Sequence, residues 1–146
     1  MASSQLVPWA LLLALLTTVV ATAERDYGEY CRVGKSIPIN PLPACREYIT
    51  RRCAVGDQQV PDVLKQQCCR ELSDLPESCR CDALSILVNG VITEDGSRVG
   101  RMEAVPGCDR ERIHSMGSFL TAYSECNLHN PGTPGGDCVL FGGGIS

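Results

Sequence analysis

The sequence predicts an all-α, disulfide-rich domain, and three observations lead to this fold class. The chain of 146 residues contains ten cysteines, an even number, and all of them lie after residue 30. Four segments repeat apolar residues at helical spacing, whereas the alternation typical of strands is weak. In an oxidising compartment such a set of cysteines is typical of a complete framework, so we expect five disulfides. The cysteines are Cys31, Cys45, Cys53, Cys68, Cys69, Cys79, Cys81, Cys108, Cys126 and Cys138.

The spacing of the cysteines does not favour a metal site. Structural zinc sites use sets such as two C-x-x-C pairs, whereas the close cysteines here are Cys68-Cys69 and Cys79-Arg80-Cys81. The only histidines are His114 and His129. We therefore expect no metal and no cofactor. Each disulfide of a small domain typically stabilises it by about 2–4 kcal/mol, so the bridges should dominate its resistance to heat and proteolysis.

The N-terminus has the features of a signal peptide. Residues Met1–Ala23 carry no charged side chain, and the apolar run Trp9–Val20 leads to the small-x-small pattern Ala21-Thr22-Ala23. This run is short for a membrane span, which needs about 20 apolar residues. We predict cleavage after Ala23, so that residues 24–146 form one secreted domain.

The charge of the chain excludes two classes of partner. It has 13 basic and 17 acidic residues, a formal net charge of −4, and no basic stripe. Nucleic acids and anionic membranes attract strongly basic surfaces. We therefore expect neither a nucleic acid nor a membrane as the partner.

Two helices are predicted in the first half of the mature chain. The first begins after the start signal Asn40-Pro41-Leu42-Pro43 and ends near Arg51-Arg52, basic residues suited to a helix C-terminus. The second covers Val60–Leu72, with Pro61 near its first turn. The apolar stripes are Leu42, Cys45, Ile49 and Cys53 in the first helix, and Val60, Leu64, Cys68 and Leu72 in the second.

Two further helices are predicted in the second half. The third begins near Asp74 and Glu77, which have the spacing of a capping box, and Gly90 is its stop signal. The fourth covers Asp109–Ala122, and Gly117 within it lowers helix stability by about 1 kcal/mol. The inward residues are Cys79, Ala83, Leu84, Leu87 and Val88 in the third helix, and Ile113, Met116 and Leu120 in the fourth.

Two segments are predicted to lack regular structure. Thr93–Gly107 is rich in glycine and ends in Pro106-Gly107, so we expect an exposed loop. From Asn127 to the C-terminus, two prolines and six glycines indicate a coil tail. We expect this tail to be pinned only at Cys138.

No arrangement of residues points to catalysis. If every cysteine is bridged, no thiolate nucleophile remains. His114 and His129 have no Ser or Asp partner nearby in the sequence. The acidic pairs Glu94-Asp95 and Asp109/Glu111 lie in a loop and at a helix start, where solvated or dipole-favoured acids are expected. We therefore expect a binding protein with no catalytic residue.

A disulfide-clamped scaffold can present a loop without a large ordering cost on binding. The segment most clearly held in this way is Ala54–Gln67, which lies between Cys53 and Cys68-Cys69. Its first part is polar and turn-like. Two interpretations remain open, a recognition loop and a plain connector between helices.

Beyond this, the cysteine order C…C…C…CC…CxC…C…C…C resembles that of the cereal-type α-amylase/trypsin inhibitor family, a branch of a group that also includes lipid-transfer proteins and 2S storage albumins. The resemblance extends over Cys31–Cys138. It includes Pro38-Ile39-Asn40-Pro41-Leu42, Cys45-Arg46-Glu47-Tyr48, Cys68-Cys69-Arg70-Glu71-Leu72, Cys79-Arg80-Cys81-Asp82-Ala83-Leu84, Pro106-Gly107-Cys108 and Glu125-Cys126-Asn127-Leu128.

The resemblance implies a fold and a pairing of the cysteines. The family fold is a four-helix bundle with long loops. Carried over by cysteine order, the family pairing implies Cys31–Cys79, Cys45–Cys68, Cys53–Cys108, Cys69–Cys126 and Cys81–Cys138.

The resemblance also implies two candidate contact sites. Trypsin-inhibiting members carry an Arg-Leu reactive bond in the loop that corresponds to Cys53–Cys68, and those positions here are Gln58 and Gln59. The preceding family proline is Asp57. A trypsin pocket requires a cation opposite its buried carboxylate, so neutral Gln58 predicts weak or absent trypsin inhibition.

The amylase contacts of bifunctional members correspond to the segment before the first cysteine and to a second short stretch. Here the segment is acidic, with three acids and one arginine, and carboxylates in an amylase cleft should repel it. In favour of amylase inhibition, the stretch Gln59-Val60-Pro61-Asp62 resembles the loop of amylase-only members. On balance we expect α-amylase inhibition. The candidate amylase contacts are Glu24, Arg25, Asp26, Tyr27, Gly28, Glu29 and Tyr30, together with Pro76, Glu77 and Ser78.

The predicted partners are therefore α-amylases, and the resemblance also leaves serine proteases of insects or mammals open. Homo- or hetero-oligomers with related inhibitors are a further expectation. Three alternatives use the same scaffold. One is an inhibitor of a protease other than trypsin. The others are a lipid-binding protein, disfavoured by ten cysteines and acidic charge, and a storage protein, disfavoured by only four glutamines in the mature chain.

Overall fold

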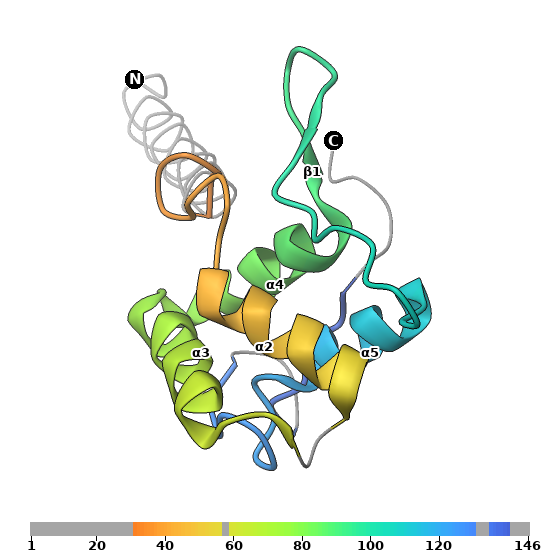
Figure 1. Cartoon of the computed structure of the whole chain (residues 1–146). Coiled ribbons are helices and arrows are strands. Elements are labelled where there is room, and N and C mark those ends of the chain that lie inside the picture. The colour runs from red at the N-terminus through yellow and green to blue at the C-terminus, as the bar shows by residue number, and fades with distance from the viewer. Residues whose placement is uncertain (1–30, 57–58, 131–134, 141–146) are drawn as a thin grey trace, which may run out of the picture.

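Four α-helices and a small hairpin surround one disulfide-linked core (Figure 1). The computed structural model describes residues 31–56, 59–130 and 135–140. The predicted signal peptide lies outside these residues. The elements are α2 (Pro43–Val55), α3 (Asp62–Asp74), the 3₁₀ turn η2 (Glu77–Cys79), α4 (Arg80–Asn89), β1 (Val91–Ile92), β2 (Arg98–Val99) and α5 (Arg110–Phe119). The predicted all-α class, with four helices and five disulfides, is confirmed.

The structure pairs the ten cysteines in the way that the family resemblance implies. The bridges hold helices to one another and to the segments that lack regular structure. Cys45 in α2 joins Cys68 in α3, and five of the ten cysteines are buried in the core. The five disulfides are Cys31–Cys79, Cys45–Cys68, Cys53–Cys108, Cys69–Cys126 and Cys81–Cys138.

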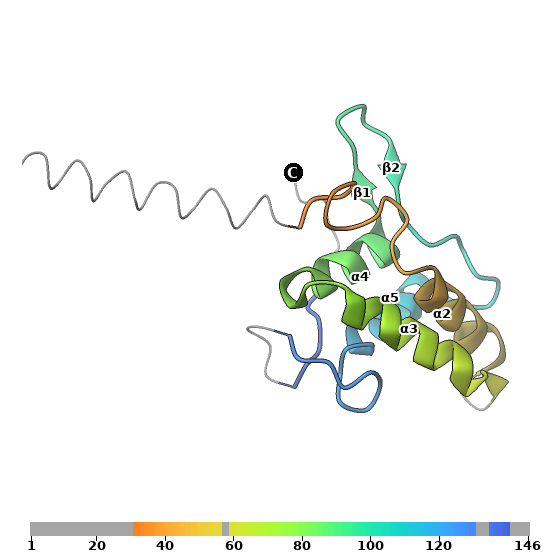
Figure 2. The ribbon, with the colours of Figure 1, turned by 90° about the vertical axis from the view of Figure 1, so that its left-hand side faces the viewer.

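The antiparallel pair of α2 and α3 forms one side of the molecule (Figure 2). α2 begins where predicted, with Pro43 in its first turn, and its N-cap residue Leu42 has the left-handed φ of 58°. Leu42 makes no side-chain cap, so the first N–H groups of α2 need another acceptor. Glu71 of α3 supplies it, accepting from Ala44 N and Cys45 N. Tertiary structure thus caps a helix that has no local cap.

The start of α4 corrects one prediction. Asp74 is not the cap of a capping box, because it is the last residue of α3. The chain turns at Leu75 and Pro76, forms η2, and continues directly into α4. The predicted stop is correct, since Gly90 has a φ of 75° and donates its N–H to Ile86 O.

The fourth predicted helix is shorter than expected, and the structure gives it a side-chain cap. The Asp109 carboxylate accepts from Arg112 N, and α5 ends at Phe119 rather than at Ala122. Gly117, which the sequence marks as a helix weakener, lies against α4. A Cβ at this position would come within 2.6 Å of Val88 Cγ2, so glycine permits the close approach of the two helices.

The segment predicted as an exposed loop contains the second strand of a hairpin and two buried hydrophobic residues. β1 and β2 pair antiparallel, with Val91 opposite Val99. Met102 and Val105, farther along, are buried in the core. The prediction of a plain exposed loop is therefore wrong. The strands have two residues each, too short for alternation to show in the sequence.

The C-terminal tail is held at more points than Cys138, which corrects a further prediction. Thr121 Oγ1 and Asn130 Nδ2 both donate to Gly136 O. Farther along, His114 Nε2 lies 2.6 Å from Leu140 O, and Leu140 is buried. The tail is therefore part of the core packing.

Candidate functional site

The connection between α2 and α3 is the candidate protease loop. Gln58, which the family resemblance predicts to occupy the position of the reactive cation, lies outside the described residues. Its neighbour Gln59 is exposed, and Val60 is half-buried. Cys53 in the last turn of α2 is bridged to Cys108, and Cys68 in the middle of α3 is bridged to Cys45 in α2. The loop therefore begins and ends on fixed supports.

A network of charges joins the two helical stems of this loop. Glu125 Oε1 lies 2.9 Å from Arg52 Nη1 in α2, and Glu125 Oε2 lies 3.1 Å from Lys65 Nζ in α3. Tyr48 donates its hydroxyl to Glu125 Oε2 at 3.2 Å, and its ring lies beneath the Arg52 guanidinium. One carboxylate thus connects the last turn of α2 with the first turn of α3.

Because Glu125 is largely shielded from solvent, this network should stabilise the fold more than a surface ion pair does. Its side chain is only 12% exposed, so solvent screens its two ion pairs less than usual. Cys126, the next residue, is bridged to Cys69 in α3. The network and the disulfide together fix the spacing of the helices that carry the loop.

The candidate amylase face lies at the other end of the α2–α3 pair. Pro76 is half-buried, whereas Glu77 and Ser78 are exposed on η2. Ser78 Oγ lies 4.0 Å from Cys31 Sγ, and Cys31 is bridged to Cys79. This bridge joins η2 to the point where the segment 24–30 enters the domain, although that segment itself lies outside the described residues.

The two candidate faces are separated by the length of the helices. α2 and α3 have 13 residues each, which at 1.5 Å per residue is about 20 Å. Gln59 follows the C-terminal end of α2, and Glu77 follows the C-terminal end of α3. Because the helices are antiparallel, these ends point in opposite directions. The predicted contacts form two sites rather than one.

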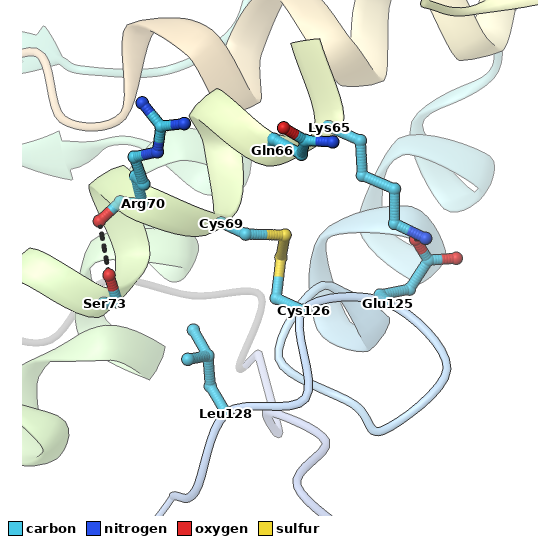
Figure 3. Close-up of a pocket in the computed structure, with 8 residues that line it drawn as sticks. All are labelled: Lys65, Gln66, Cys69, Arg70, Ser73, Glu125, Cys126 and Leu128. Atoms are coloured by element: carbon cyan, nitrogen blue, oxygen red, sulfur yellow. Dashed lines mark hydrogen bonds and ion pairs between the residues drawn. A yellow bond between two sulfur atoms is a disulfide. The ribbon is translucent and has the colours of Figure 1, made fainter. Parts of the chain in front are cut away.

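An open groove of about 410 Å³ runs along the outer side of α3 (Figure 3). The Cys69–Cys126 disulfide lies in its wall, and charged side chains surround it. A lipid site would be largely enclosed, whereas this groove is open to solvent, so it does not favour the lipid-binding alternative. Its lining residues are Lys65, Gln66, Cys69, Arg70, Ser73, Glu125, Cys126 and Leu128.

The described residues contain no free thiol and no metal-binding cluster. All ten cysteines are disulfide-bonded. Across residues 31–56, 59–130 and 135–140, no cluster of three or more His, Cys, Asp or Glu side chains could hold a metal ion. In the same ranges, no helix combines the length and the apolar character that crossing a bilayer requires.

The polar residues that hold these sites in place give no signal in the sequence patterns that predict helices. Glu71 and Glu125 stand within motifs that carry the family resemblance, but helical periodicity gave them no role. Arg80 is 7% exposed and donates to the carbonyls of Leu72, Ser73 and His129. Its place in the motif between two cysteines was the only signal for it.

Comparison with known proteins agrees with this architecture. The model of the Protease inhibitor/seed storage/LTP family matches residues 27–138. The chain is 47% identical over 104 residues to a trypsin/factor XIIA inhibitor of Zea mays, covering 69% of this chain and 67% of the relative. It is 38% identical to an α-amylase/trypsin inhibitor of Hordeum vulgare, covering 92% of both chains.

Solved structures give the same result. The crystal structure of the bifunctional inhibitor from ragi matches with a TM-score of 0.65 at 38% identity, over 77% of this chain and 97% of that one. The maize bifunctional Hageman factor/amylase inhibitor matches with a TM-score of 0.61, over 69% of this chain and 90% of that one. The chain therefore belongs to the Protease inhibitor/seed storage/LTP family, in its cereal-type α-amylase/trypsin inhibitor branch.

Proposed function

We propose that the chain is a secreted seed defence protein that inhibits a digestive α-amylase and acts by binding rather than catalysis. The observation that carries the proposal is the exposed turn Glu77-Ser78, which is fixed beside Cys31 by the Cys31–Cys79 bridge. A fixed turn loses little entropy on binding, so more of its contact energy remains as affinity. Relatives named as α-amylase/trypsin inhibitors support this class of target.

Trypsin is the less favoured target because of the residue at the reactive position. The pocket of trypsin-like proteases holds a buried carboxylate that pairs with a cation. Gln58 would leave that carboxylate without a charged partner, which costs several kcal/mol in a buried pair. We therefore propose weak or absent inhibition of trypsin.

Inhibition of a protease with another specificity is the second candidate. The observation that favours it is the support of the loop. Glu125 ties both stems together, and such a scaffold suits a rigid inhibitory loop whether or not its reactive residue is basic. A protease that accepts a neutral polar residue would be the target.

The test is inhibition by the oxidised mature protein of a panel of insect and mammalian α-amylases, trypsin and chymotrypsin. We expect inhibition of at least one amylase and little of trypsin. Gln58→Arg should lower the inhibition constant for trypsin at least tenfold by supplying the missing cation, while Gln59→Arg, the matched control, should not. Strong trypsin inhibition by the wild type, lost in Gln58→Ala, would contradict the proposal.

A further inference from the structure

Three exposed arginines gather around the C-terminal end of α4. Arg98 lies in β2, Arg101 lies two residues beyond that strand, and Arg110 is the first residue of α5. A Cβ built on Gly90 would come within 2.9 Å of both Arg101 Cβ and Arg98 Cγ, so the two side chains start from the same turn. Arg110 reaches this turn from α5 and donates to Val88 O.

Two of these side chains are held in place by the helix end. Arg98 Nη1 donates to Asn89 O at 2.7 Å, and Arg110 Nη2 donates to Val88 O. These carbonyls are among the last of α4, where a cation is favoured by the helix dipole. A guanidinium has five N–H donors, so each arginine keeps most of its donors for a ligand.

The three charges are close to one another. Burial and then the positive charges of Arg101 and Arg98 lower the pKa of Arg110 from its usual value. Among the residues that the structure describes, none of the three arginines forms an ion pair with a carboxylate. The cluster is therefore a concentration of positive charge on a chain whose net charge is −4.

Two nearby acids, Asp95 and Asp109, have partners in their own turns, whereas Glu103 and Glu111 are exposed acids close to Arg101 and Arg110 in the sequence. Asp95 accepts hydrogen bonds from Thr93 and Ser97 within the hairpin turn. The Asp109 carboxylate is the cap of α5 and accepts from Arg112 N. Asp95 and Asp109 are therefore engaged by their own turns, and among the described residues neither Glu103 nor Glu111 forms an ion pair with the three arginines.

An apolar side chain accompanies the cations. Ile92 is paired with Arg98 across the hairpin, and paired residues of antiparallel strands project on the same side. Ile92 is 51% exposed. The hairpin projects from the body of the molecule (Figure 2), so a partner can reach this side. Arginine beside an exposed apolar residue is a composition enriched at protein interfaces.

We propose that Arg98, Arg101 and Arg110 form a cationic docking surface for the acidic rim of an α-amylase active cleft. The inference rests on the proposed function and names a surface for it. Glycosidases cleave between paired carboxylates, so their clefts carry negative charge. Arginine matches the geometry of a carboxylate with two parallel hydrogen bonds. The acidic segment 24–30 could not supply this attraction.

Arg101 is the arginine to substitute, because Arg98 and Arg110 also donate hydrogen bonds to the end of α4 and their loss could disturb the fold. Arg101→Gln and Arg101→Glu are compared with the wild type for inhibition of an α-amylase from the panel, at low and high salt. Arg70→Glu is the matched control, since Arg70 is an exposed arginine on α3, and the net charge changes equally. Thermal unfolding of each variant checks the fold.

We expect Arg101→Glu to weaken amylase inhibition about tenfold at low salt, mainly through a slower association rate, with a smaller effect of Arg101→Gln. High salt should reduce the difference, and Arg70→Glu should behave as the wild type does. Equal effects of Arg101→Glu and Arg70→Glu, or unchanged inhibition, would overturn the docking surface while the proposed function stands. A wild type that inhibits no amylase would overturn both, and weakened inhibition of a protease alone would overturn the assigned partner.

Discussion

Glu71 of α3 holds the N-terminus of α2 by accepting a hydrogen bond from Ala44 N at 2.9 Å. Its second interaction, with Cys45 N, extends the cap to the next residue. The contact crosses between two helices that the Cys45–Cys68 disulfide also joins. A side chain 27 residues away thus caps the helix, a role that a local Ser or Asp usually has at a helix start.

We predict that Glu71→Ala lowers the free energy of unfolding by about 1–2 kcal/mol, the usual range for a lost N-cap. Two backbone N–H groups of α2 lose a charged acceptor, and the substitution opens no large space. Urea unfolding of the oxidised protein measures the change. Glu47→Ala is the control, because Glu47 is exposed and pairs only with Arg51 on the surface of α2. Equal effects of the two substitutions would contradict the cap.

Glu125→Gln should loosen the connection between α2 and α3. The substitution keeps the size of the side chain but leaves Arg52 and Lys65 without their carboxylate, at a cost of about 2 kcal/mol. We expect faster hydrogen exchange in the first turn of α3, measured by mass spectrometry, in addition to a lower unfolding free energy. The control is Glu111→Gln, at an exposed position of α5. Its hydrogen exchange in α3 and its unfolding free energy should stay unchanged.

Gly117→Ala should destabilise the protein even though alanine favours helices. The new Cβ would meet Val88 Cγ2 at 2.6 Å and Leu140 Cδ1 at 3.3 Å. Overpacking of this kind typically costs about 1–3 kcal/mol, more than the gain of about 1 kcal/mol from helix propensity. Thermal unfolding should show a lower Tm. Ser115→Ala, on the exposed side of the same helix, should leave the Tm equal or slightly higher.

Asp95 should titrate well below an ordinary carboxyl group. Hydrogen bonds from the side chains of Thr93 and Ser97, and from the Ser97 N–H, lower its pKa to about 2. Since the folded pKa lies below the unfolded value of about 3.9, the ionised carboxylate favours the folded hairpin. That contribution is complete above about pH 4 and is lost as the pH falls towards 2.

NMR titration of the Asp95 side chain measures this midpoint directly. Protection of the Thr93 amide, which donates to Ser97 O, should decline over the same range. Asp95→Asn should lose the pH dependence of this amide. A midpoint near 4 would contradict the hydrogen bonds to the carboxylate.

Much of the fold could be predicted because it depends on local patterns. Pro43 at the first turn of α2 and Gly90 as the stop of α4 were both visible as single residues. The cysteine order led to a family, and with it to the five pairs that the structure contains. These signals work because start and stop residues act on the backbone next to them.

The failures concern interactions between residues far apart in the chain. Asp74 has the spacing of a capping box but closes α3 instead, because the chain turns at Leu75 and Pro76. The hairpin after α4 has strands too short to show a pattern. The tail is held by Asn130 and His114, and no local rule connects either residue with residues 136–140.

The sequence by itself determined the helical class, the oxidised framework and the family, and it led to the prediction that neutral Gln58 occupies the reactive position. Only the tertiary structure decided how the sites are supported. Glu71, Glu125 and the three arginines around Gly90 acquire their roles from partners on other elements. A sequence pattern reports which face of a helix is apolar, whereas the partner of a polar side chain depends on how the helices pack.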